Sequence, residues 1–82
     1  MSVPSAAAIS AGHDLMLGAI VETADLAASY ARSAAEAAWR GDELTVRVHL
    51  GQLRLATIEA IRILNELVAE SVRAAEIGRA HV

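Results

Sequence analysis

Apolar residues recur at three- and four-residue steps along most of the chain, which is the spacing of one face of an α-helix. The pattern predicts two amphipathic helices over residues 14–40 and 43–76, with loosely ordered ends at 1–12 and 78–82. The apolar face of the first helix should consist of Met16, Ile20, Thr23, Ala24, Ala27, Tyr30, Ala31, Ala34 and Ala38. The apolar face of the second should consist of Leu50, Leu53, Thr57, Ala60, Ile61, Leu64, Leu67, Val68 and Ala75.

Gly41 and Asp42 interrupt this pattern at mid-chain. A glycine suits the left-handed residue that ends a helix, and an aspartate accepts hydrogen bonds from the free amides that begin the next one. Ser5, Ser10 and Gly12 are candidate caps for the first helix. We therefore predict an all-α fold, in which residues 1–82 form a single domain built as an antiparallel two-helix hairpin.

Residues 44–50 allow a different interpretation, because they alternate apolar and polar side chains as a β-strand does. A strand there would favour a ribbon–helix–helix DNA-binding dimer. That fold needs two helices after its strand, yet residues 52–76 contain no glycine or proline to separate them. Asp42 would also cap a helix where the strand would begin. We expect residues 44–50 to be helical.

Two antiparallel helices leave apolar surface uncovered here, because the second helix is apolar over a wide arc that includes Ile58, Ile63 and Val72. Pairing two hairpins into a dimeric four-helix bundle would cover that arc. A chain this short also gains stability from such pairing. The predicted dimer interface consists of Leu53, Ile61, Leu64, Leu67 and Val68, with Trp39 as a candidate anchor.

The chain carries few residues of catalytic or metal-binding type. It has no cysteine, and His13, His49 and His81 are spread over its start, middle and end. They form no Glu-x-x-His or His-x-x-x-His spacing of the kind that binds metals on helices. Neither a nucleophile motif nor a glycine-rich phosphate loop is present. We expect no catalytic residue, no cofactor and no metal, and therefore not an enzyme.

Charge and hydropathy restrict the expected partners. The net charge is −3, and a mildly acidic chain lacks the clustered cations that nucleic-acid binding requires. The longest apolar run, residues 15–21, is far shorter than the ~20 residues that span a bilayer. The N-terminus lacks the basic and apolar regions of a secretory signal. We expect a cytoplasmic protein that binds itself and another protein, without nucleic acid or membrane insertion.

The tripeptide Trp39-Arg40-Gly41 at mid-chain resembles that of the WXG family, which comprises small exported helical-hairpin proteins. In that family a Trp-x-Gly turn joins two long antiparallel helices. The tail at 76–82 lacks the family's tyrosine-plus-acid export signal. The resemblance implies export without a cleavable signal peptide and a homo- or heterodimeric state.

The leading hypothesis is a non-enzymatic, homodimeric helical hairpin that acts through protein–protein contact as an adaptor, regulator or anti-factor. The first alternative is a WXG-like exported hairpin, and the second is a small DNA-binding regulator, which requires a strand at 44–50. Because tryptophan buries a large area, we also expect Trp39 to be partly buried, packing on residues such as Leu44 or Val48.

Overall fold

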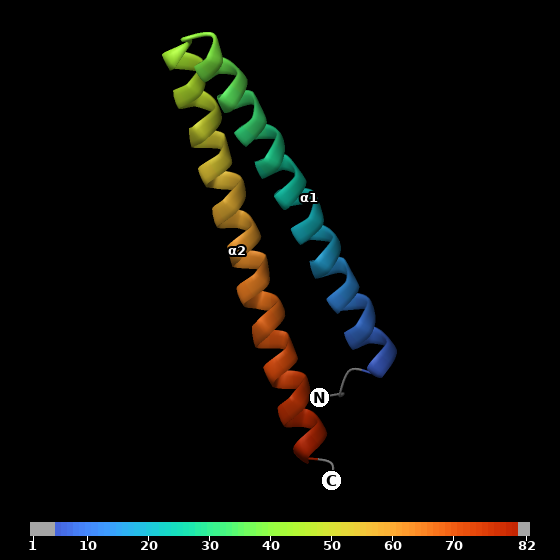
Figure 1. The fold of residues 1–82 in the computed structure, drawn as a ribbon. Coiled ribbons are helices and arrows are strands. Elements are labelled where there is room, and N and C mark those ends of the chain that lie inside the picture. Colours follow the sequence, from blue (N-terminus) through green and yellow to red (C-terminus); the bar gives the residue numbers. More distant parts are fainter. Residues whose placement is uncertain (1–4, 81–82) are drawn as a thin grey trace.

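The computed structural model describes residues 5–80, which form two antiparallel helices and the turn between them (Figure 1). Helix α1 spans Ala6–Trp39 and helix α2 spans Glu43–Ala80. The hairpin measures 62 × 18 × 16 Å. The described residues contain no strand, so the predicted all-α hairpin is confirmed, and residues 44–50 belong to α2.

The turn forms through local hydrogen bonds at Gly41 and Asp42, as predicted. Gly41 has φ 72°, in the left-handed region that glycine adopts without strain. Its amide donates to the Ala38 carbonyl at 3.0 Å, and the Asp42 amide donates to the Ala37 carbonyl at 2.9 Å. These two bonds define a Schellman motif at the end of α1. The Asp42 carboxylate caps α2 by accepting from the Thr45 amide at 3.1 Å and from its hydroxyl at 2.6 Å.

Both helices extend beyond their predicted ends. Among the candidate caps, Ser5 is the one used, and its hydroxyl oxygen accepts from the Ala8 amide at 3.2 Å. The prediction of a loose end at 1–12 is therefore wrong for residues 6–12, while residues 1–4 lie outside the described part. Helix α2 continues through Gly78 to Ala80, because one glycine costs a helix only about 1 kcal/mol. Residues 81–82 also lie outside the described part.

The two helices meet along a seam with the four- and three-residue spacing of a coiled coil. All its members are buried or half-buried: Met16, Ile20, Thr23, Ala27, Tyr30, Ala34 and Ala37 on α1, and Val46, His49, Leu53, Ala56, Ala60, Ile63, Leu67 and Ala74 on α2. The Tyr30 and His49 rings stack with their centroids 6.4 Å apart. The seam is narrow, because few of its side chains are almost fully buried. Among the described residues these are Ala34, Ala37, Ala56, Ile63 and Leu67.

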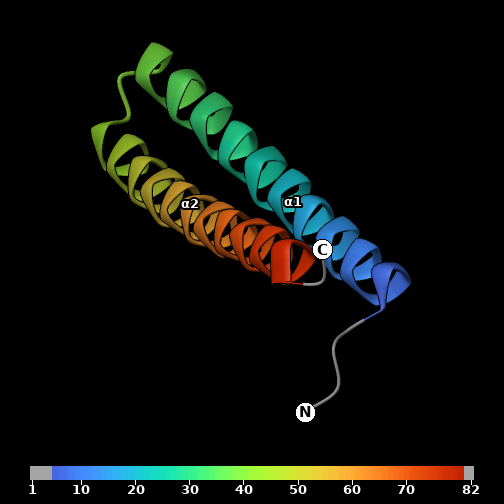
Figure 2. The same cartoon turned by 90° about the horizontal axis from the view of Figure 1, so that it is seen from below.

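The observed seam covers only part of the apolar faces that the sequence predicts. Members of those predicted faces that are exposed in the hairpin are Ala24, Ala31, Ala38, Leu50, Thr57, Ile61, Leu64, Val68 and Ala75. Ala37, Ala56 and Ile63 are buried instead. A helix with one neighbour buries only the arc that faces that neighbour, and the apolar arc of α2 is wider than this. The helices also separate from the turn towards the chain ends in the view of Figure 1, and Figure 2 shows the same two helices from below.

Candidate interaction surface

The residues that follow each seam position by one make up a second surface, here named the apolar flank. Successive side chains of an α-helix point in directions about 100° apart around its axis. Because α1 and α2 run antiparallel, this step turns both helices to the same side of the hairpin. The apolar flank consists of Leu17, Val21, Ala24, Ala28, Ala31, Ala35 and Ala38 on α1, and Arg47, Leu50, Arg54, Thr57, Ile61, Leu64, Val68 and Ala75 on α2; all of them are exposed.

The apolar flank is unusual for a protein surface in contact with water. Its large side chains are between 42% and 59% exposed; they are Leu17, Val21, Leu50, Ile61, Leu64 and Val68. Its charged members are Arg47 and Arg54, and Arg47 forms an ion pair with Glu43 near the turn. Contiguous apolar patches of this kind on a single chain mark sites of contact with another molecule.

The residues that precede each seam position by one face the other side of the hairpin and are named the charged flank. They are Leu15, Ala19, Glu22, Leu26, Ser29, Ser33 and Glu36 on α1, and Thr45, Val48, Gln52, Leu55, Glu59, Arg62, Glu66 and Arg73 on α2. Arg62 forms ion pairs with both Glu59 and Glu66, and its Nε donates to Glu59 Oε2 at 3.0 Å. This hydrogen bond lowers the pKa of Glu59 and raises that of Arg62.

The structure divides the predicted interface residues between two surfaces. Leu53 and Leu67 lie in the seam of the hairpin itself, whereas Ile61, Leu64 and Val68 lie together on the apolar flank. The predicted list omitted the contribution of α1, chiefly Leu17 and Val21. The signal that could have revealed it is the second series of apolar residues in α1, offset from the seam by one position.

Trp39 does not pack within the hairpin. Its side chain is 92% exposed, so the expected partial burial against Leu44 or Val48 is wrong for the single chain. Those two residues are themselves 73% and 52% exposed. The cause is its position on α1: Trp39 lies two residues after Ala37 and five after Ala34, both buried against α2, so the helix turns its side chain to the opposite side, away from α2.

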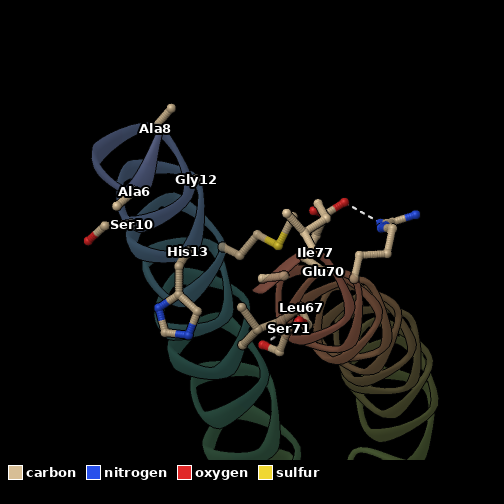
Figure 3. Close-up of a pocket in the computed structure, with 12 residues that line it drawn as sticks. Ala6, Ala8, Ser10, Gly12, His13, Leu67, Glu70, Ser71 and Ile77 are labelled. Carbon is tan, nitrogen blue, oxygen red and sulfur yellow. Dashed lines mark hydrogen bonds and ion pairs between the residues drawn. The ribbon is translucent and has the colours of Figure 1, made fainter. Parts of the chain in front are cut away.

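A cleft of about 820 Å³ separates the helices at the end opposite the turn, here named the open end (Figure 3). Its lining is mostly apolar and comprises Ala6, Ala8, Ser10, Gly12, His13 and Met16 from α1, and Leu67, Glu70, Ser71, Arg73, Ala74 and Ile77 from α2. Glu70 and Arg73 pair with each other on the α2 side. Ser10 and Ser71 continue the spacing of the apolar flank, so the cleft adjoins that flank.

The carboxylate of Asp42 serves the local structure of the turn. Hydrogen bonds from the Thr45 hydroxyl and amide lower the pKa of Asp42, as an anionic helix cap requires. The described residues contain no group of three or more side chains that could hold a metal ion. Within residues 5–80, neither helix has a stretch long and apolar enough to cross a membrane.

Comparison with known proteins found no matching family model, no similar curated protein and no similar solved structure.

Proposed function

We propose that this chain is a non-enzymatic, homodimeric helical hairpin that acts through protein–protein contact, as an adaptor, regulator or anti-factor. The observation that carries the proposal is the apolar flank, an exposed surface with two charged residues among fifteen that runs over both helices. Pairing two such flanks forms a four-helix bundle, since each helix then contacts a second neighbour. The charged flank stays outside the bundle and remains accessible to another protein.

The exposed area of the hairpin supports pairing. A compact monomer of 8.6 kDa would expose roughly 4,700 Å² by the usual scaling with mass. The hairpin exposes 6163 Å², which exceeds that value by about 1,500 Å². A stable interface of standard size buries about 800 Å² on each partner. The excess exposed area of the elongated hairpin is therefore larger than the area that one such interface buries on each partner.

Light scattering on a sizing column, with a thermal melt of the same sample, tests the proposal. We expect twice the 8.6 kDa chain mass and a cooperative transition. Leu64→Ala, on the apolar flank, should weaken the dimer by about 2–3 kcal/mol, whereas Leu55→Ala, on the charged flank of the same helix, should leave it intact. A monomer with a poorly cooperative melt would contradict homodimerisation and favour a hairpin that pairs with a different chain.

The second candidate is a WXG-like exported hairpin that works as a homo- or heterodimer. The observation that favours it is the mid-chain turn, where exposed Trp39 directly precedes Arg40 and the left-handed Gly41. Detection of the chain outside cells that also carry a specialised secretion system would support this candidate.

The DNA-binding alternative depended on a strand at 44–50, where the structure has helix. A cytoplasmic location accords with the leading proposal.

A further inference from the structure

We propose that the part of α2 next to the turn is a second binding surface, which takes an amphipathic α-helix of another protein with acidic residues along one edge. This surface, here named the outer stripe, consists of Leu44, Val48, Gly51, Leu55 and Ile58. The inference rests on the proposed function, because it names the chemistry of the other protein that the hairpin contacts. It leaves the apolar flank to the homodimer.

The outer stripe is exposed in the hairpin and lies outside the seam. Val48 and Leu55 belong to the charged flank, and the other three members lie farther round α2, opposite the side that faces α1. The exposed fractions of its large side chains are 73% for Leu44, 52% for Val48, 68% for Leu55 and 51% for Ile58. A homodimer formed through the apolar flank therefore leaves this surface free for another chain.

The spacing of the outer stripe suits a helix as its occupant. Its members follow one another at steps of four and three residues, the spacing at which one helix packs its side chains between those of another. Gly51 lies in the middle and has no side chain, so it leaves a gap between Val48 and Leu55 that an apolar side chain of the partner helix would fill. A second copy in register would place Gly51 against Gly51 and leave that layer empty. The occupant is therefore a different chain.

The outer stripe also has a defined length. Asp42 caps α2 just before Leu44, while Arg62 and Asn65 occupy the next two positions of the series after Ile58. At a rise of about 1.5 Å per residue, the stripe is about 21 Å long. Amphipathic helices that bind a complementary apolar surface use anchor residues at this spacing. A partner helix of about four turns would cover the whole stripe.

The charges beside the outer stripe favour an acidic partner. The chain has a net charge of −3, yet residues 44–58 contain two arginines and no aspartate or glutamate. Arg47 and Arg54 lie seven residues apart on the border between the apolar flank and the outer stripe, and their long side chains extend along the surface. Arg47 pairs with Glu43, whereas Arg54 forms no ion pair with any residue that the structure describes. Because charges that border an apolar stripe determine which helices pair, acidic residues on the facing edge of the partner would complete this surface.

A membrane surface matches these features less well. Attachment to anionic lipid uses clusters of roughly four to eight basic residues, whereas the outer stripe is bordered by two. The gap at Gly51 also has no use on a fluid lipid surface, which adapts to any side-chain shape. The observations therefore favour a helix.

Fluorescence anisotropy with two synthetic peptides tests the chemistry of the partner. Both peptides would be about 21 residues long, with leucine at heptad positions a and d and a fluorescein label. One would carry glutamate and the other lysine at every e and g position, so that like charges keep each peptide from pairing with itself. We expect the glutamate peptide to bind about 10-fold more tightly than the lysine peptide, and the difference to shrink in 1 M salt.

Two substitutions, each with a matched control, locate the binding surface. Leu55→Ala should weaken binding of the glutamate peptide about 10-fold, whereas Leu15→Ala, which removes an equally exposed leucine of α1 near the open end, should not. Arg54→Gln should reduce the difference between the two peptides several-fold. Arg32→Gln, which removes an exposed arginine of α1, should leave that difference unchanged.

Light scattering of the same samples separates this inference from the proposed function. A dimer that binds both peptides equally, or binds neither with a Kd below about 1 mM, would overturn the outer stripe as a site for an acidic helix and leave the homodimer standing. A monomer that binds the glutamate peptide through Leu55 would support the outer stripe and contradict the homodimer. Equal effects of Leu55→Ala and Leu15→Ala would also overturn the inference.

Two further measurements distinguish the other occupants. Binding of the chain to anionic phospholipid vesicles that is lost in Leu55→Ala would assign the outer stripe to a membrane and overturn the inference. Assemblies larger than a dimer that Leu55→Ala reduces to dimers would assign it to a second copy and overturn the inference as well. We expect neither result, and we expect the wild-type dimer to bind the glutamate peptide without a change in its own association.

Discussion

The apolar flank and the charged flank are built from the same two helices, each one residue away from the same seam. Of the fifteen positions in each, the apolar flank has two charged residues and the charged flank has six. Both carry exposed leucines, so hydrophobicity alone does not distinguish them. The difference is that Arg62, Glu59 and Glu66 pair on the charged flank and keep that side hydrated. A small set of charges thus determines which side of the hairpin is suited to bind another chain.

The charged flank also limits association to one side. An aliphatic surface on both sides of a hairpin would favour open-ended stacking of copies, which charges on one side oppose. Glu22 and Glu36 extend this effect to α1. The comparison therefore predicts a closed dimer, and adding a charge to the apolar flank should abolish it.

The largest effect is expected from Ala28→Glu compared with Ser29→Glu. These neighbours on α1 are both exposed in the single hairpin, but Ala28 belongs to the apolar flank and Ser29 to the charged flank. Burying an unpaired carboxylate at an interface costs on the order of 3–5 kcal/mol. Sedimentation equilibrium should show Ala28→Glu to be monomeric over a concentration range in which Ser29→Glu remains dimeric.

Circular dichroism supplies the control for this pair, since both variants should keep their helical spectrum at low temperature. Equal dimerisation by the two variants would show that the apolar flank is not the contact surface. Loss of dimerisation by Ser29→Glu alone would place the contact on the charged flank.

A smaller effect is expected from substitution of Gly41 and Gly51. These substitutions change the stability of the hairpin itself, on which both flanks depend. Gly41→Ala forces a side chain into a left-handed residue and should cost about 1–2 kcal/mol of unfolding free energy. Gly51→Ala should stabilise the protein by about 0.5–1 kcal/mol, because it lies within α2 and its added Cβ meets nothing within 4 Å. Thermal melts at one fixed protein concentration would measure both, and stabilisation by Gly41→Ala would contradict the observed turn.

The sequence predicted the hairpin and its turn well, because Gly41 and Asp42 act through local bonds that need no distant partner. It predicted less well which part of the apolar face of α2 contacts α1. Periodicity locates the widest apolar stripe, and in α2 that stripe includes both Leu67, which faces α1, and Leu64, which does not. Which part of a stripe faces its own hairpin depends on how closely the two helices approach, and the small residues Ala34, Ala37 and Ala56 determine that approach. The cleft arises from helix separation at the open end, which no local pattern encodes.

The smallest effect is expected from acid titration of the charged flank. The hydrogen bond from Arg62 holds the pKa of Glu59 below its ordinary value of 4.5. A lowered folded-state pKa stabilises the protein above about pH 4.5, and this contribution is lost as pH falls through the folded value. Melts of wild type and Glu59→Gln should therefore differ slightly near neutral pH and converge as the pH falls below the folded-state pKa of Glu59. Because Asp42, whose pKa is also lowered, is present in both proteins, its titration cancels from the comparison.

Titration of Glu59 should leave the dimerisation constant unchanged, because Glu59 lies on the charged flank. A group on the apolar flank would change that constant. Glu59 and Arg62 are on the side of the hairpin that the dimer leaves in water, and exposed ion pairs contribute little to stability. The small difference between wild type and Glu59→Gln should also shrink in 1 M salt, because ions screen such pairs. The dimerisation constants of the two proteins should agree at every pH at which both are folded. A weaker Glu59→Gln dimer at neutral pH would mean that the Glu59–Arg62 pair lies in the contact and that the assignment of the two flanks must be reversed.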